Sequence, residues 1–128
     1  MQVEVENAIG ELRRQFPSAQ VTVNDDGQGG AHFFVEPIEL GSKYSPSSTW
    51  VGAHIPAQYP YADIYPVFIA SDVKRVDGSA FTAPITANAN FQGRPALQIS
   101  RRNNTAQTRP QTAVAKILKV LDFLDKLP

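Results

Sequence analysis

The sequence predicts an α+β domain in which one helix near each end of the chain packs against an antiparallel sheet. Apolar residues recur at helical spacing near both ends of the chain, and they alternate with polar residues over several short stretches between. The chain has 128 residues, 42% of them hydrophobic. That is enough for one core and too little for two ordinary domains. We therefore expect residues 1–128 to form a single domain.

An apolar stripe with helical spacing begins the chain. Its members are Val5, Ala8, Ile9, Leu12 and Phe16. Two glutamates lie early in this segment, and Arg13 and Arg14 lie late, which complements the dipole of a helix. Pro17 is expected to end the helix.

Four short stretches have the pattern of strands. Residues 21–23 and 31–35 alternate on either side of a run of turn-forming residues at 24–30, which predicts a hairpin. After a polar loop at 41–48, residues 50–55 alternate again, and residues 67–70 form a short apolar run. Short connections between them predict an antiparallel four-stranded meander.

The passage between the last two strands is rich in proline and tyrosine. Pro56, Pro60 and Pro66 lack amide donors and bias the preceding residue towards extended geometry, which predicts polyproline-like coil. The tyrosines at 59, 61 and 65 are expected to pack this coil onto the domain.

The rest of the chain divides into a loop and a helix. Residues 72–108 show little periodicity and are expected to form an ordered, irregular, functional loop. Residues 111–127 then carry a strong apolar stripe, with Pro110 near the first turn and Thr108 as the expected N-cap.

Composition excludes several classes of function. Twelve basic residues balance twelve acidic ones, so no overall field favours nucleic acid or an anionic membrane. The chain has no cysteine, and its two histidines are far apart in the sequence, so neither disulfides nor a metal site are expected. No cofactor is expected either. Neither a signal peptide nor a transmembrane run is apparent, which makes the cytoplasm the expected location.

The order of these elements resembles that of ubiquitin-conjugating enzymes. Tyr59-Pro60 and Tyr65-Pro66 are similar to the family's Tyr-Pro and the prolines that follow it, and Thr108-Arg109-Pro110 is similar to its Trp-Ser-Pro without the tryptophan. The resemblance covers nearly the whole chain. The single C-terminal helix is most similar to the short bacterial members found in ubiquitin-like conjugation operons. The resemblance implies a UBC-like fold with an irregular active-site loop.

The same resemblance singles out Ser100. The family's catalytic cysteine lies eight positions before its tryptophan, and that count from Thr108 reaches Ser100. Three alternatives follow: a native serine nucleophile that forms an oxyester, an engineered serine in place of a catalytic cysteine, or an ordinary loop serine in an inactive variant. The family's His-Pro-Asn is absent; Asn88 and Asn90 are candidates for its asparagine, whereas an ungapped count reaches Gln92.

Further candidates surround this position. A serine hydroxyl needs a general base, and no histidine is close to Ser100 in the sequence. Arg101, Arg102 and Asn103 are candidates to bind the tail of a ubiquitin-like protein or to stabilise an oxyanion, although a solvated loop would look the same. Arg13 and Arg14 lie where the family contacts its activating enzyme, and Tyr59 is a further candidate contact.

The expected function is therefore that of a carrier. It would accept a ubiquitin-like protein from an activating enzyme as an ester on Ser100, or on a cysteine that Ser100 replaces, and transfer it to an amine of a target protein. The alternative is a catalytically inactive variant that binds such partners as an adaptor.

Overall fold

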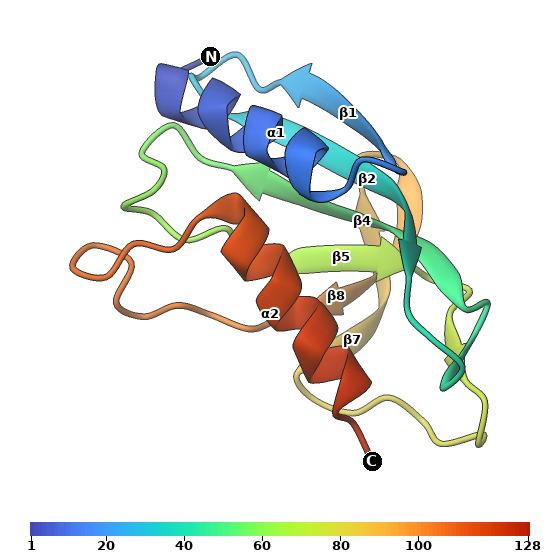
Figure 1. Ribbon diagram of the computed structural model, residues 1–128. Helices are drawn as coiled ribbons and strands as arrows, with labels where there is room; N and C mark the ends of the chain where they lie inside the picture. The colour runs from blue at the N-terminus through green and yellow to red at the C-terminus, as the bar shows by residue number, and fades with distance from the viewer.

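The computed structural model describes residues 1–128 and contains two helices and two sheets (Figure 1). The helices are α1 (Val3–Gln15) and α2 (Ala113–Asp125). The main sheet consists of β1 (Gln20–Asp25), β2 (Ala31–Glu39), β4 (Ser48–Ile55), β5 (Val67–Ala70), β7 (Ile85–Phe91) and β8 (Arg94–Ile99). Two short strands, β3 (Tyr44–Ser45) and β6 (Lys74–Arg75), pair separately. The α+β class predicted from the sequence is confirmed.

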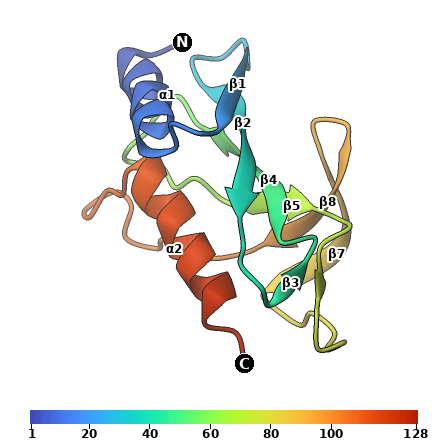
Figure 2. The same cartoon turned by 45° about the vertical axis from the view of Figure 1, so that its right-hand side comes forward.

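The main sheet has six antiparallel strands, so the prediction of four is wrong. Its order is β1-β2-β4-β5-β8-β7. The first four of these strands form the expected meander, and the added pair is a hairpin that continues the sheet beyond β5 (Figure 2). Both helices cover the same face of the sheet (Figure 1).

The added hairpin lies inside the segment 72–108, which was expected to be an irregular loop. Ile85 and Phe91 at the ends of β7 are buried, as are Leu97 and Ile99 in β8, but small polar residues separate them. These residues pair through the backbone, which any side chain permits, so the pairing left little trace in the hydrophobic pattern. The register shifts between Thr86 and Ala89, a bulge that bends the hairpin.

The main core lies between the sheet and the helices. The apolar stripe of α1 is buried there, as are the predicted core-facing residues Val51, Ala53 and Ile55 of β4. The C-terminal helix begins later than predicted: its N-cap is Thr112, whose hydroxyl accepts a hydrogen bond of 3.0 Å from Ala115 N. Neither helix is long and apolar enough to cross a membrane.

The passage from Pro56 to Pro66 folds as turns and not as the polyproline-like coil predicted from its prolines. Tyr59 N donates to Pro56 O at 3.0 Å, and Tyr61 N donates to Gln58 O at 2.9 Å. These local hydrogen bonds reverse the chain within a few residues. Tyr59 is buried against the core as expected, whereas the side chain of Tyr61 is 59% exposed.

A second, aromatic cluster covers the opposite face of the sheet. Phe91, near the tip of the bent hairpin, stacks on Phe68 with ring centroids 4.7 Å apart and contacts Phe34 at 5.2 Å. Gly52 makes this approach possible, because a Cβ atom there would lie 2.7 Å from Cε2 of Phe91. The guanidinium of Arg94 lies 4.0 Å from the centroid of Phe34 and completes the cluster.

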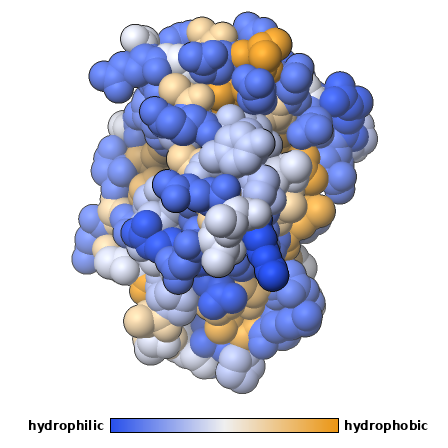
Figure 3. Space-filling model, turned by 90° about the vertical axis from the view of Figure 1, so that its left-hand side faces the viewer, coloured by the Kyte–Doolittle hydropathy of each residue, from blue (hydrophilic) through white to orange (hydrophobic).

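The side of the molecule that carries the tyrosine-rich turns and the loop before α2 is largely hydrophilic (Figure 3). Apolar side chains appear there only in small, separate areas. Recognition on this side therefore depends on polar and charged groups.

Candidate functional site

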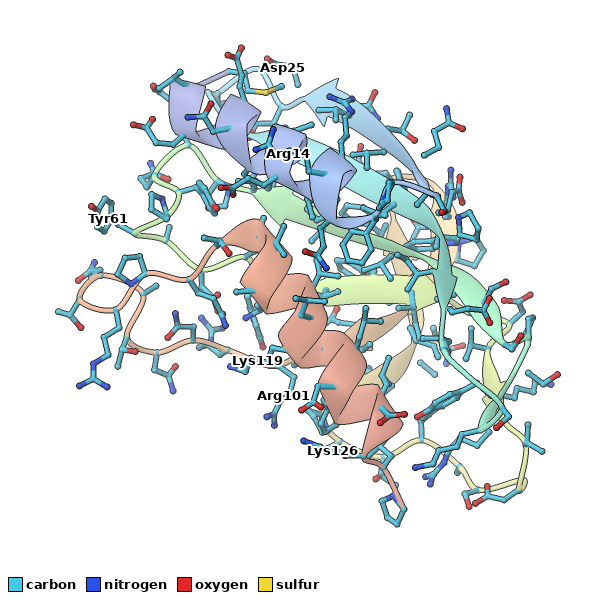
Figure 4. All side chains as sticks on the ribbon, viewed as in Figure 1. Arg14, Asp25, Tyr61, Arg101, Lys119 and Lys126 are labelled. Atoms are coloured by element: carbon cyan, nitrogen blue, oxygen red, sulfur yellow. The ribbon has the colours of Figure 1, made fainter.

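The candidate site lies where β8 ends and three other segments meet it. These segments are the tyrosine-rich turns 56–66, the loop 101–112 and helix α2. Six residues with ionisable or nucleophilic side chains come together there: Asp63, Tyr65, Ser100, Arg101, Arg102 and Lys116. Figure 4 shows Arg101 beside α2, on the same side of the helix as Lys119.

A buried ion pair forms the base of the site. Lys116 in α2 is only 2% exposed, and its Nζ lies 3.0 and 3.1 Å from the two carboxylate oxygens of Asp63. The same ammonium donates a short hydrogen bond to the carbonyl of Arg101. Burial lowers the pKa of Lys116 below its ordinary value, although Asp63 opposes that shift. One ammonium thus ties α2 to both of the other segments.

Asn103 and Asp63 hold the loop in place. Asn103 N donates to Asp63 Oδ2 at 2.7 Å, and Asn103 Nδ2 donates to Arg109 O at 3.2 Å. Its Oδ1 accepts from the amide of Thr105 at 3.1 Å. The side chain of this predicted binding residue is therefore engaged in ordering the loop.

Ser100 has one ionisable neighbour, Tyr65, which sequence reasoning treated only as a packing residue. Hydrogen bonds with Ser100 and then with Arg102 lower the pKa of the Tyr65 phenol. The Arg102 guanidinium carbon also lies 3.9 Å from the centroid of the Tyr65 ring. Ser100 Oγ accepts from Gln98 Nε2 at 3.3 Å. The half-buried serine thus lies between an amide and an acidified phenol.

The two candidate asparagines lie elsewhere. Asn90 pairs with Pro95 in the β7–β8 hairpin, whereas Ser100 follows the other end of β8. At about 3.3 Å per residue, these positions are roughly 16 Å apart along the strand. Asn88 occupies the bulge with φ 63°, and Asn90 Oδ1 accepts from Gly93 N at 3.1 Å. The structure therefore does not bring either asparagine to Ser100.

The remaining predicted contacts are also dispersed. Tyr59 is 7% exposed, and its hydroxyl accepts from Ala113 N at 3.0 Å, so it caps the start of α2 and offers no binding surface. Burial raises the pKa of its phenol. Arg13 and Arg14 are exposed on α1, separate from the Ser100 site, and Arg13 donates to Val21 O at 3.3 Å.

Both histidines lie on the sheet and are paired with each other and with Asp26. His54 Nε2 lies 2.7 Å from Asp26 Oδ2, and the rings of His32 and His54 are 4.6 Å apart. Burial and the neighbouring His54 lower the pKa of His32. No group of ligating side chains capable of holding a metal ion is present.

The pairing of Asp26 makes stability dependent on acidic pH. The His54 hydrogen bond and the amides of Gln28 and Gly30 lower the pKa of Asp26 from 3.8 to about 2. Because the folded state lowers this pKa, the carboxylate stabilises the fold above about pH 4 and loses that effect as the pH falls towards 2. In urea unfolding, the midpoint difference between wild type and Asp26→Asn should shrink between these pH values. A difference unchanged at pH 2 would contradict this.

No family model, curated protein or solved structure matches this chain. The geometry of the site is accordingly the basis for its functional interpretation.

Sequence reasoning found Ser100 and its basic neighbours but missed Asp63, Tyr65 and Lys116. A signal for Lys116 was present, because it lies on the buried stripe of α2 beside Ile117 and between Ala113 and Val120. A lysine within a buried apolar stripe indicates a buried anionic partner. Nothing in the sequence identified that partner as Asp63.

Proposed function

We propose that this chain is a noncatalytic binding module of the ubiquitin-conjugating type, which holds a ubiquitin-like protein through the loop that follows Ser100. The observation that carries the proposal is the fate of the expected catalytic set. Ser100 is half-buried, and the candidate asparagines belong to the other end of the hairpin. The loop 101–112, by contrast, is ordered by Asn103 and largely exposed.

The order of helix, meander, loop and helix supports the family assignment. The absence of cysteine removes the nucleophile on which that family depends. The sixfold sheet is a departure from the four strands that the resemblance implies.

A second candidate function is the serine carrier, favoured by the contact between Ser100 and Tyr65. In that reaction Ser100 Oγ attacks the thioester carbonyl that joins the ubiquitin-like protein to its activating enzyme. The Tyr65 phenolate takes the serine proton, the activating enzyme leaves as a thiolate, and an oxyester forms. The lowered pKa of Tyr65 raises the phenolate fraction available near neutral pH.

One experiment separates these functions. The chain is incubated with ATP, an activating enzyme and its ubiquitin-like protein, using a panel from bacterial conjugation operons. The binding module predicts that amide signals of residues 101–112 shift on titration with a ubiquitin-like protein and that no adduct forms. The carrier predicts an adduct that survives thiol reductant, is cleaved by hydroxylamine, and is lost in Ser100→Ala.

Variants of Tyr65 sharpen the test. Tyr65→Phe removes the proposed base but keeps the ring under Arg102. Loss of adduct in both Ser100→Ala and Tyr65→Phe supports the carrier, whereas an adduct unaffected by either contradicts Ser100 as the nucleophile. Neither adduct nor binding across an active panel contradicts both functions.

A further inference from the structure

The neutral chain conceals a division of charge. Residues 100–128 contain six basic and two acidic residues, a net charge of +4, and residues 1–99 therefore carry −4. The basic part consists of the loop after β8 and helix α2, which are adjacent in space (Figure 1). The positive charge is thus concentrated on one region of the surface.

Four cations in that region have no anionic partner. They are Arg101, Arg102, Arg109 and Lys119, and none of them appears among the ion pairs of the protein. Asp63, the nearby carboxylate, is already used by Lys116 and by the amide of Asn103. We call these four residues the cationic surface.

Two contacts show that these charges lie close together. Arg101 and Lys119 both lower the pKa of Lys116 by charge repulsion, and Figure 4 draws them side by side. The Arg101 guanidinium lies 4.7 Å from the ring centroid of Phe123, and its buried Nε has no hydrogen-bond partner. Like charges kept this near to one another without a counter-ion favour an anion from outside.

A groove adjoins the cationic surface. It runs between the tyrosine-rich turns and the loop, has a volume of about 420 Å³, and is lined by Tyr61, Arg102 and Asn104 among others. The exposed ring of Tyr61 supplies apolar area, and the loop amides supply polar contacts. These features suit an extended peptide segment.

We propose that the cationic surface and this groove bind an acidic, extended segment of a partner protein. This goes beyond the proposed function, because it requires neither an ester nor a ubiquitin-like fold. A short segment can contact the +4 region alone. Nucleic acid or an anionic membrane would also meet the surface formed by residues 1–99, whose net charge of −4 repels a polyanion.

The test uses a short fluorescein-labelled oligoglutamate peptide and fluorescence anisotropy at low and physiological salt. Wild type should bind the peptide, more weakly as salt rises, and should not bind a Gly-Ser peptide. The variant Arg102→Gln/Arg109→Gln/Lys119→Gln should bind about tenfold more weakly, since each exposed charge contact contributes a modest factor. Its thermal unfolding should match wild type, because these side chains form no ion pair.

A matched control removes the same charge elsewhere. Arg14→Gln/Lys74→Gln/Arg75→Gln alters exposed or half-buried cations of α1 and β6, and it should leave peptide affinity within about twofold. Equal losses in both variants, or no binding by wild type, would overturn the proposal. So would tighter binding of single-stranded DNA or of phosphatidylserine vesicles through the same three residues.

Discussion

Replacing Lys116 by methionine should lower the free energy of unfolding by about 3 kcal/mol or more, the largest single effect expected in this protein. Methionine fits the space of the lysine stem but leaves the carboxylate of Asp63 without its ammonium. The carbonyl of Arg101 loses its donor as well. Chemical denaturation followed by circular dichroism measures the loss.

A second variant distinguishes an unpaired charge from lost packing. Asp63→Leu/Lys116→Met removes both members of the pair, so no charge is left buried, and it should be more stable than Lys116→Met alone. If the double variant is the less stable one, the buried ion pair is not the source of the effect.

Lys126 supplies a matched control on the same helix. Its ion pair with Asp122 at 3.1 Å is exposed, with side-chain exposures of 73% and 60%. Lys126→Met should therefore change stability by less than about 0.5 kcal/mol. Hydrogen exchange adds a local measure: Lys116→Met should speed exchange in residues 101–112, and Lys126→Met should leave it unchanged.

Replacing Phe91 by alanine should cost about 3 kcal/mol, because the ring is 6% exposed and packs on the outer face of the sheet. The hairpin that carries it is an edge of the sheet, so the loss should also increase exchange of β7 amides. Denaturation and hydrogen exchange measured on the same variant check both statements. Unchanged protection in β7 would show that the ring does not hold the hairpin.

Gly52 should be coupled to Phe91. In wild type, Gly52→Ala places a methyl group 2.7 Å from the ring and should destabilise the protein by about 1–3 kcal/mol. Once Phe91→Ala has removed the ring, the same change should cost clearly less, since the remaining close atom is Phe33 O at 3.0 Å. Equal costs in both backgrounds would contradict the coupling.

Gly10 provides the control for a glycine without such a neighbour. A Cβ there meets only the flexible side chain of Arg14, at 3.4 Å, and the residue is helical. Gly10→Ala should therefore stabilise the protein by about 0.5–1 kcal/mol, with or without Phe91.

Most of the fold followed from local patterns. The helical stripe at residues 5–16, the alternation in β1, β2 and β4, and the apolar run of β5 all predicted the observed elements. Each of these segments has one face on the core, so its periodicity is written in its own residues. The β7–β8 hairpin escaped because small polar residues such as Thr86 and Asn90 leave no such record.

The site divided along the same line. The sequence by itself determined which residues were available: a serine, basic neighbours, no cysteine, and the helices and strands that would carry them. Only the tertiary structure decided that Ser100 meets Tyr65, that Lys116 meets Asp63, and that the candidate asparagines lie elsewhere. These pairs join segments many residues apart, and the packing that brings them together is a property of the whole core.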